Sequence, residues 1–217
     1  MQLHYHPVSP YSQKTLLAFH EKGVSFTPRL VDVTSPEAKA AYQREVYGLG
    51  KIPLLVVPEE SLRLPESSLI AEWLDERFPE RGPRLIPADR TKSREVRMLD
   101  RLADGCLSEP MAKVVFDGMR APEDRDPRGT RVARSLLDRA YGVLEERLAE
   151  QGSTWLAGAD YSLADCAATP PLFFLQRIHP YTDHRHLTAY AARLSERPSW
   201  QKVLAEAAPW LEAFSKS

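Results

Sequence analysis

The chain has 217 residues, of which 43% are hydrophobic and 27% charged, and its formal net charge is −1. This composition is ordinary for a globular protein that buries a core, and the length suits two small domains. A net charge so close to zero argues against a polyanionic partner, so we expect no binding of nucleic acid.

The sequence predicts neither a secretory signal nor a membrane span. The N-terminus lacks a basic segment followed by an apolar run, and the most apolar stretch, residues 166–175, is interrupted by Pro170 and Pro171. Only two cysteines, Cys106 and Cys166, are present, which excludes a disulfide framework. We therefore expect a protein of the reducing cytoplasm that does not associate with a membrane.

Residues 1–78 are predicted to form an α/β domain. Alternating and β-branched stretches indicate strands, and apolar residues at helical spacing indicate helices. The expected strands are residues 2–6, 26–31, 54–57 and 62–64, and the expected helices are residues 14–22, 37–42 and 67–78. The first two strands are joined by a helix and the last two by a short turn, which predicts a mixed four-stranded sheet.

Residues 79–89 form a charged linker rich in proline, and residues 90–217 are predicted to form an all-helical domain. Every strong apolar period after the linker is helical; one stripe includes Val96 and Leu99. Ser162 and Asp165 have the spacing of a capping box, with aspartate in place of the usual glutamate or glutamine. We find no internal repeat.

Three short motifs lie next to the expected strands: Ser9-Pro10, Ile52-Pro53 and Glu66-Ser67. Proline lacks an N–H, so Pro53 suits the start of a strand. Because bonds preceding proline tolerate the cis form, we hypothesise that Ile52-Pro53 is cis and turns the Ile52 backbone toward a peptide ligand. Ser67 at a helix start offers its hydroxyl and free N–H groups to a carboxylate.

Each motif also has a purely structural interpretation. Ser9 is a common turn residue, and Ser12 is expected to be the N-cap of the first helix. The Ser12 hydroxyl or the Tyr11 phenol are alternatives to Ser9 as the reactive group. A trans strand start is the alternative at Ile52-Pro53, and Glu66 and Ser67 suit an ordinary helix cap with first-turn acidity just as readily.

The order of elements and four stretches resemble the cytosolic glutathione transferase family. The stretches are residues 9–14, 50–55, 66–70 and 161–165. The first is similar to the N-terminal motif of omega-, tau- and zeta-like members, with serine at the leading position. The resemblance covers essentially the whole chain and implies a thioredoxin-like domain, an all-helical domain and a homodimer.

The resemblance implies that Ser9 donates a hydrogen bond to the sulfur of glutathione. The thiolate is the attacking species, and lowering a thiol pKa by ~2 units takes roughly 2.7 kcal/mol of preferential interaction with the charged form. A serine hydroxyl and a nearby helix N-terminus supply part of this. Tyr11 is expected to line an apolar pocket for a small hydrophobic electrophile, and no metal is required.

The same resemblance assigns the glutathione contacts. The Ile52 backbone would pair with the cysteinyl unit, with Pro53 in the cis form. Glu66 would receive the γ-glutamyl ammonium and Ser67 its carboxylate, while Lys51 is expected to reach the glycyl carboxylate.

Two other functions stay open. An isomerase acting on maleylacetoacetate shares the glutathione addition, although the Ser-Ser-Cys run of zeta-like members is absent from residues 8–11. A non-catalytic interaction or stress-response protein on the same fold is the second, because fold alone does not determine function. Disulfide chemistry like that of omega-like members is disfavoured, since position 9 lacks a thiol.

Overall fold

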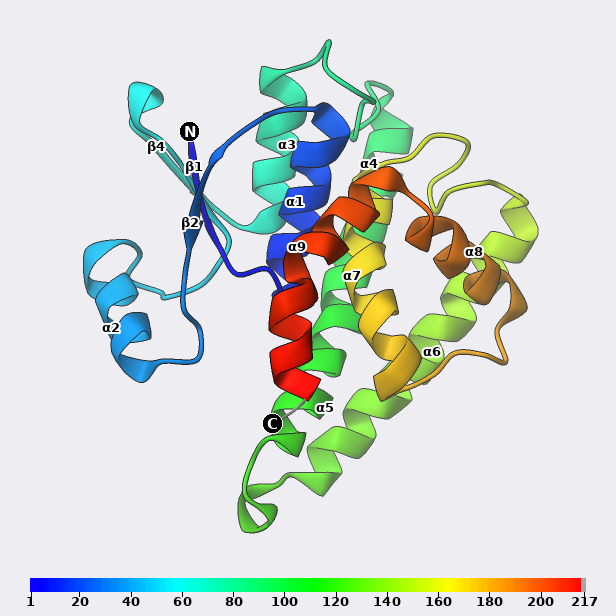
Figure 1. The fold of residues 1–217 in the computed structure, drawn as a ribbon. Coiled ribbons are helices and arrows are strands. Elements are labelled where there is room, and N and C mark those ends of the chain that lie inside the picture. Colours follow the sequence, from blue (N-terminus) through cyan, green and yellow to red (C-terminus); the bar gives the residue numbers. More distant parts are fainter. Residues whose placement is uncertain (216–217) are drawn as a thin grey trace. The chain divides into compact units, whose positions relative to one another are not determined.

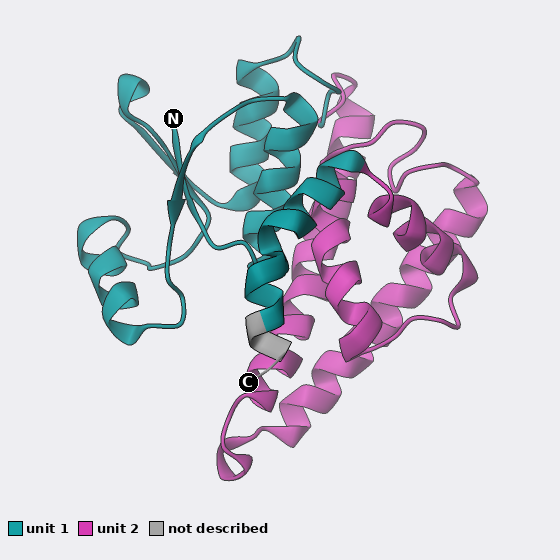
Figure 2. Cartoon of the chain, in the orientation of Figure 1, with its two compact units in different colours: residues 1–85, 198–217 teal, residues 86–197 magenta. Residues whose placement is uncertain are grey.

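The structure is a computed structural model that describes residues 1–215, with side chains as far as residue 212. The chain forms two compact units (Figure 2). Unit 1 combines residues 1–85 with the C-terminal helix from Pro198, and unit 2 comprises Ile86–Arg197. The predicted boundaries at residues 78 and 90 concern domains rather than packing units, and they stay a prediction.

Unit 1 contains the mixed four-stranded sheet that the sequence predicts. Its strands are β1 (Gln2–Tyr5), β2 (Thr27–Leu30), β3 (Leu54–Val57) and β4 (Leu62–Pro65), in the order β2-β1-β3-β4. β1 pairs in parallel with β2, while β1 with β3 and β3 with β4 are antiparallel. This arrangement confirms the expected crossover and hairpin.

Four helices complete unit 1. They are α1 (Pro10–Lys22), α2 (Pro36–Glu45), α3 (Ser67–Arg77) and α9 (Pro198–Ser215). α1 and α3 lie on one side of the sheet and α2 lies on the other (Figure 1). α1 and α3 pack together over buried apolar side chains such as Leu16 and Ile70, and a buried ion pair joins Lys22 to Asp75 at 2.9 Å.

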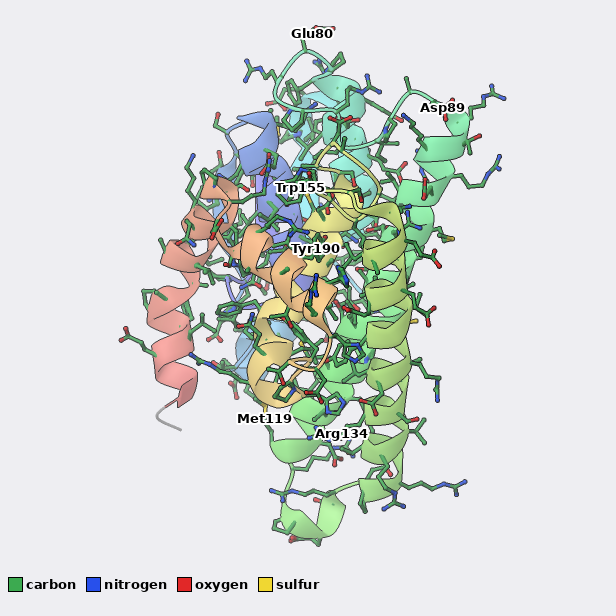
Figure 3. The ribbon with its side chains drawn as sticks, turned by 90° about the vertical axis from the view of Figure 1, so that its right-hand side faces the viewer. Glu80, Asp89, Met119, Arg134, Trp155 and Tyr190 are labelled. Atoms are coloured by element: carbon green, nitrogen blue, oxygen red, sulfur yellow. The ribbon has the colours of Figure 1, made fainter. Side chains whose placement is uncertain are left out.

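Unit 2 is built from helices, as predicted. They are α4 (Arg90–Leu102), α5 (Glu109–Gly118), α6 (Pro127–Gln151), α7 (Leu163–Ile178) and α8 (Arg185–Ser195), with a π-helical segment, Ala103–Ser108, between α4 and α5. The predicted capping box is present at the start of α7. Asp165 there also accepts a hydrogen bond from the hydroxyl of Tyr190 on α8 (Figure 3).

Within the described part of the chain, no helix combines the length and the apolar character needed to cross a membrane.

Candidate functional site

The strand register of unit 1 gathers the three predicted motifs. Leu54 pairs with His4 of β1 on one side and with Pro65 of β4 on the other. β1 therefore ends, β3 begins and β4 ends at the same edge of the sheet. Because each motif directly precedes or follows one of these strand ends, the topology brings all three to one end of unit 1.

Ser9 is the N-cap of α1, a role that we predicted for Ser12. Its backbone is extended (φ −75°, ψ 122°), and its Oγ accepts a hydrogen bond from the Ser12 N–H at 3.4 Å. Pro10 occupies the first helical position, where its fixed φ and missing N–H suit a helix start. The prediction placed the cap one turn too late. As an acceptor, the half-buried Ser9 hydroxyl retains its own proton for donation.

The other two candidates for the sulfur contact differ in accessibility. Ser12 is 0% exposed, and its Oγ accepts a hydrogen bond from the His6 N–H at 3.4 Å. This burial separates its hydroxyl from any ligand that approaches from solvent. Tyr11 is half-buried, and its carbonyl accepts a hydrogen bond from Thr15. Tyr11 therefore remains accessible together with Ser9.

The peptide bond between Ile52 and Pro53 is cis, as hypothesised. Within residues 1–215, no hydrogen bond to the Ile52 backbone is found. The preceding carbonyl, that of Lys51, accepts a hydrogen bond from the Tyr42 hydroxyl at 3.1 Å, while the Lys51 side chain is exposed. Burial raises the pKa of Tyr42 to about 12, so this hydroxyl stays a donor. The Ile52 backbone thus keeps its polar groups available to a ligand.

Glu66 adopts a backbone conformation that is unusual for a residue with a side chain. Its φ is +72° and its ψ is 118°, in a region that costs ~1 kcal/mol or more for residues other than glycine. Glu66 is the N-cap of α3, but its exposed side chain makes no capping hydrogen bond. Such strain persists where a position serves a ligand, which makes Glu66 a candidate for function.

The start of α3 is electropositive. The serine side chains at N-cap positions of α1 and α2 accept helix N–H groups, whereas the first N–H groups of α3 lack such a cap. Ser67 is 3% exposed, and the ammonium of Lys14, itself 1% exposed, donates to the Ser68 hydroxyl at 2.8 Å. A helix N-terminus with a neighbouring cation favours a carboxylate.

Sequence reasoning missed Lys14 and His6. Lys14 lies three and four residues before Leu17 and Ala18 on the buried side of α1, which was the available signal. His6 ends the first expected strand and was not singled out from the sequence as a site residue, yet its imidazole is buried next to the Ser9 turn. Among the described residues, no group of three histidine, cysteine, aspartate or glutamate side chains is placed to hold a metal ion.

An α/β unit with this strand order, a cis-proline before β3 and a chain that continues into helices are typical of the glutathione transferase class of proteins. Residues 3–82 match the family model described as "Glutathione S-transferase, N-terminal domain", and residues 108–198 match "Glutathione S-transferase, C-terminal domain". The chain belongs to the cytosolic glutathione transferase family.

Individual relatives cover nearly the whole chain. The chain is 30% identical to FtsZ-localized protein A of Caulobacter vibrioides, over 96% of this chain and 92% of that protein. It is 27% identical to the glutathione S-transferase-like protein OpS6 of Beauveria bassiana, over 94% of each. A crystal structure of a glutathione S-transferase from Methylobacillus flagellatus, with glutathione bound, superposes with a TM-score of 0.82 at 28% identity, covering 93% of this chain and 98% of that one.

Proposed function

We propose that the protein is a glutathione transferase that adds the glutathione thiolate to small hydrophobic electrophiles, with Ser9 stabilising the thiolate. The observation that carries this proposal is the state of the Ser9 hydroxyl. It accepts the Ser12 N–H at 3.4 Å at the start of α1 and is half-buried rather than enclosed. Its remaining proton is available to a sulfur atom, and the helix N-terminus favours the negative charge.

The contacts of the peptide itself follow from the other two motifs. Support for a cysteinyl unit paired with Ile52 comes from the backbone groups of that residue, to which no hydrogen bond from residues 1–215 is found. The uncapped start of α3, with Lys14 beside Ser68, suits the γ-glutamyl carboxylate at Ser67. The exposed carboxylate of Glu66 then receives the ammonium, and exposed Lys51 the glycyl carboxylate. Tyr11 lines the pocket for the electrophile.

The decisive experiment titrates the protein with glutathione and follows the thiolate absorbance of the complex as a function of pH. In the Ser9→Ala variant we expect the pKa of the bound thiol to rise by about 1–2 units, and kcat/KM below that pKa to fall about 10–100-fold. The matched control is Ser35→Ala. Ser35 is the N-cap serine of α2 and accepts the Ala38 N–H at 3.2 Å.

Both variants lose one helix cap, at a cost of about 1 kcal/mol of stability. Only Ser9→Ala should lose thiolate. If both variants form thiolate as the wild type does, Ser9 is not the group that stabilises sulfur, and Tyr11→Phe becomes the next variant to titrate.

A second candidate is a non-catalytic protein that uses the fold for interaction. A relative named FtsZ-localized protein A favours this alternative, because its name describes location rather than catalysis. The same titration separates the two functions. A protein that does not bind glutathione, or binds it without ionising the thiol, is an interaction protein.

We also propose a cytoplasmic homodimer. Neither Cys106 nor Cys166 forms a disulfide in the described structure, which suits a reducing compartment. Each unit exposes large apolar side chains of the kind that subunit interfaces cover, including Leu69 on α3 and Met98 on α4. Sedimentation equilibrium is expected to give twice the mass of the 24.6 kDa chain.

A further inference from the structure

His6 contacts the turn that carries Ser9 through three of its own atoms. Its carbonyl accepts the Ser9 N–H at 3.0 Å, and its N–H donates to the Ser12 Oγ at 3.4 Å. The third contact comes from the side chain, because Nδ1 accepts the Val8 N–H at 3.3 Å. The imidazole thus fixes a backbone group next to Ser9, and removing it would leave the Val8 N–H without that partner.

These contacts assign the tautomer of the imidazole. Because Nδ1 accepts a hydrogen bond, it carries no proton, and the neutral ring holds its proton on Nε2. His6 is 1% exposed, and among the side chains described, those of residues 1–212, no hydrogen-bonding atom pairs with Nε2. The ring lies edge-on to the indole of Trp210 on α9, with 4.8 Å between the centroids. Burial of an imidazole in this setting favours its neutral form.

The groups around His6 favour that neutral state. Burial lowers the pKa of the imidazole, and the carboxylate of Asp32, after β2, opposes part of this shift. α1 presents the uncharged Ser12 and Gln13, of which Gln13 donates to the Pro7 carbonyl at 2.8 Å. On α9, the Glu206 carboxylate accepts a hydrogen bond from the Tyr5 hydroxyl. Asp32 is thus the charged group of the described structure that acts on the His6 imidazole.

We propose that neutral His6 is a positioning residue for Ser9: its Nδ1 holds the Val8 N–H and thereby fixes the turn that aims the Ser9 hydroxyl at sulfur. This inference rests on the proposed function. Protonation of Nδ1 would replace the acceptor by a second N–H facing the Val8 N–H, so the turn would have to open. Acid should therefore remove thiolate in two ways, by protonating the sulfur and by releasing the Ser9 turn.

Two variants of His6 separate the acceptor from the bulk of the ring. Phenylalanine keeps the ring but offers no acceptor, whereas asparagine places an amide oxygen near the position of Nδ1 and cannot be protonated. For His6→Phe we expect the pKa of bound glutathione to rise by about one unit, with kcat/KM about tenfold lower below that pKa. For His6→Asn we expect the pKa of bound glutathione to shift by less than about half a unit and kcat/KM to stay within about threefold of wild type.

The pH profile gives a sharper reading. Below both pKa values, log kcat/KM of the wild type should fall with a slope of about 2 per pH unit, because two protonations disable the site. In His6→Asn the slope should be about 1, because only the sulfur titrates. The Val8 amide signal in a ¹⁵N NMR titration of the protein without glutathione should move with His6 protonation in the wild type and stay constant in His6→Asn.

The matched control is His20→Phe. His20 on α1 also has a lowered pKa caused by burial and an Nε2 with no hydrogen-bond partner within residues 1–215, but it does not contact the Ser9 turn. Its replacement should leave the thiol pKa unchanged. An equal shift in His6→Phe and His20→Phe would overturn the inference, since loss of any buried histidine would then suffice.

A double variant completes the test. If His6 acts through Ser9, adding His6→Phe to Ser9→Ala should cause no further loss of thiolate, while a further tenfold loss would contradict the inference. The two proposals fail differently. Absence of thiolate in the wild type overturns both, whereas normal thiolate in wild type and in His6→Phe overturns only the role of His6.

Discussion

The Asp165 network of unit 2 and the Ser9 turn of unit 1 treat their buried polar groups differently. In unit 2, the buried carboxylate of Asp165 accepts hydrogen bonds from the Leu156 N–H, from the N–H and hydroxyl of Ser162, and from the Tyr190 hydroxyl. Next to the Ser9 turn, by contrast, two buried side-chain atoms have no hydrogen-bond partner among the side chains that the structure describes. They are His6 Nε2 and Gln13 Oε1.

This difference distinguishes a structural network, that of Asp165, from a candidate functional site at the Ser9 turn. Buried polar groups normally have a hydrogen-bond partner, so each buried group without one needs an explanation. A saturated network such as that of Asp165 stabilises one arrangement of its unit. The exceptions at His6 and Gln13 both belong to side chains that hold the Ser9 turn. We infer that the hydrogen bonding of these two side chains is incomplete because they position a reactive group.

The largest expected effect comes from breaking the network of unit 2. Asp165→Ala removes the acceptor of four hydrogen bonds from a fully buried position, so we expect the free energy of unfolding to fall by about 3–5 kcal/mol. Urea denaturation measures this change. The fraction of protein that remains folded should still ionise glutathione with an unchanged pKa.

Asp160→Ala is the control for that variant. Asp160 is exposed in the loop just before α7, so its loss should change stability by less than about 0.5 kcal/mol. A stable Asp165→Ala protein would contradict the view that unit 2 depends on this network. A shifted pKa of bound glutathione in Asp165→Ala would contradict the view that this network is separate from the glutathione site.

An intermediate effect is expected at Glu66, where stability and function should move in opposite directions. Glycine tolerates the φ of +72°, so Glu66→Gly should stabilise unit 1 by about 1 kcal/mol. Loss of the carboxylate should weaken glutathione binding about tenfold. Denaturation and calorimetric titration measure the two changes.

Ser61→Gly is the matched control, because Ser61 is exposed and also has a positive φ, 51°. It should give a similar stabilisation and leave glutathione affinity unchanged. Should Glu66→Gly bind glutathione as tightly as the wild type, the strain at Glu66 would have no connection with the ligand.

Local signals in the sequence were sufficient to predict the elements whose backbone conformation is strongly restricted by residue type. β3 spans Leu54–Val57, as predicted, because a proline before an apolar β-branched run leaves few alternatives. The cis bond at Ile52-Pro53, the parallel pairing of the first two strands, the hairpin of the last two, and the capping box at Ser162 are confirmed for similar reasons. Each of these features depends on neighbours in the sequence.

The features that the sequence did not reveal depend on distant contacts. Ser9 and Ser12 are both good N-cap residues, and what distinguishes them is that the Ser12 hydroxyl is occupied by the N–H of His6. The burial of His6 and Lys14 likewise results from packing of α9 and α3, which residue type does not encode. For the site residues, the sequence predicts which motifs meet at one end of unit 1, while the chemical roles of these residues remain proposals.

The smallest expected effect is a difference in the acid sensitivity of the two units. In unit 1, burial lowers the pKa of His4, His6 and His20 below the ordinary value of 6.5. Between that value and the folded pKa, the unfolded chain binds more protons than the folded one, so stability falls as the pH falls. Unit 1 should therefore begin to lose stability just below about pH 6.5.

Unit 2 should respond only in stronger acid. The N–H of Asp126 lowers the pKa of Asp117, and the ammonium of Lys113 lowers that of Asp126, each from an ordinary value of 3.8. Stability from these carboxylates is present above pH 3.8 and is lost as the pH falls through their folded pKa values. Asp165, whose pKa burial raises, acts in the opposite direction.

Hydrogen exchange followed by mass spectrometry can measure both units in one sample, at about pH 7 and about pH 5, after correction for the intrinsic exchange rate. Peptides from α1 and β1 should lose protection at the lower pH while those from α6 and α7 keep it. Replacing all three histidines of unit 1 by asparagine should remove the difference. Equal loss of protection in both units would mean that buried imidazoles do not set the acid sensitivity of unit 1, and the contrast between the Asp165 network and the Ser9 turn would then rest on hydrogen bonding alone.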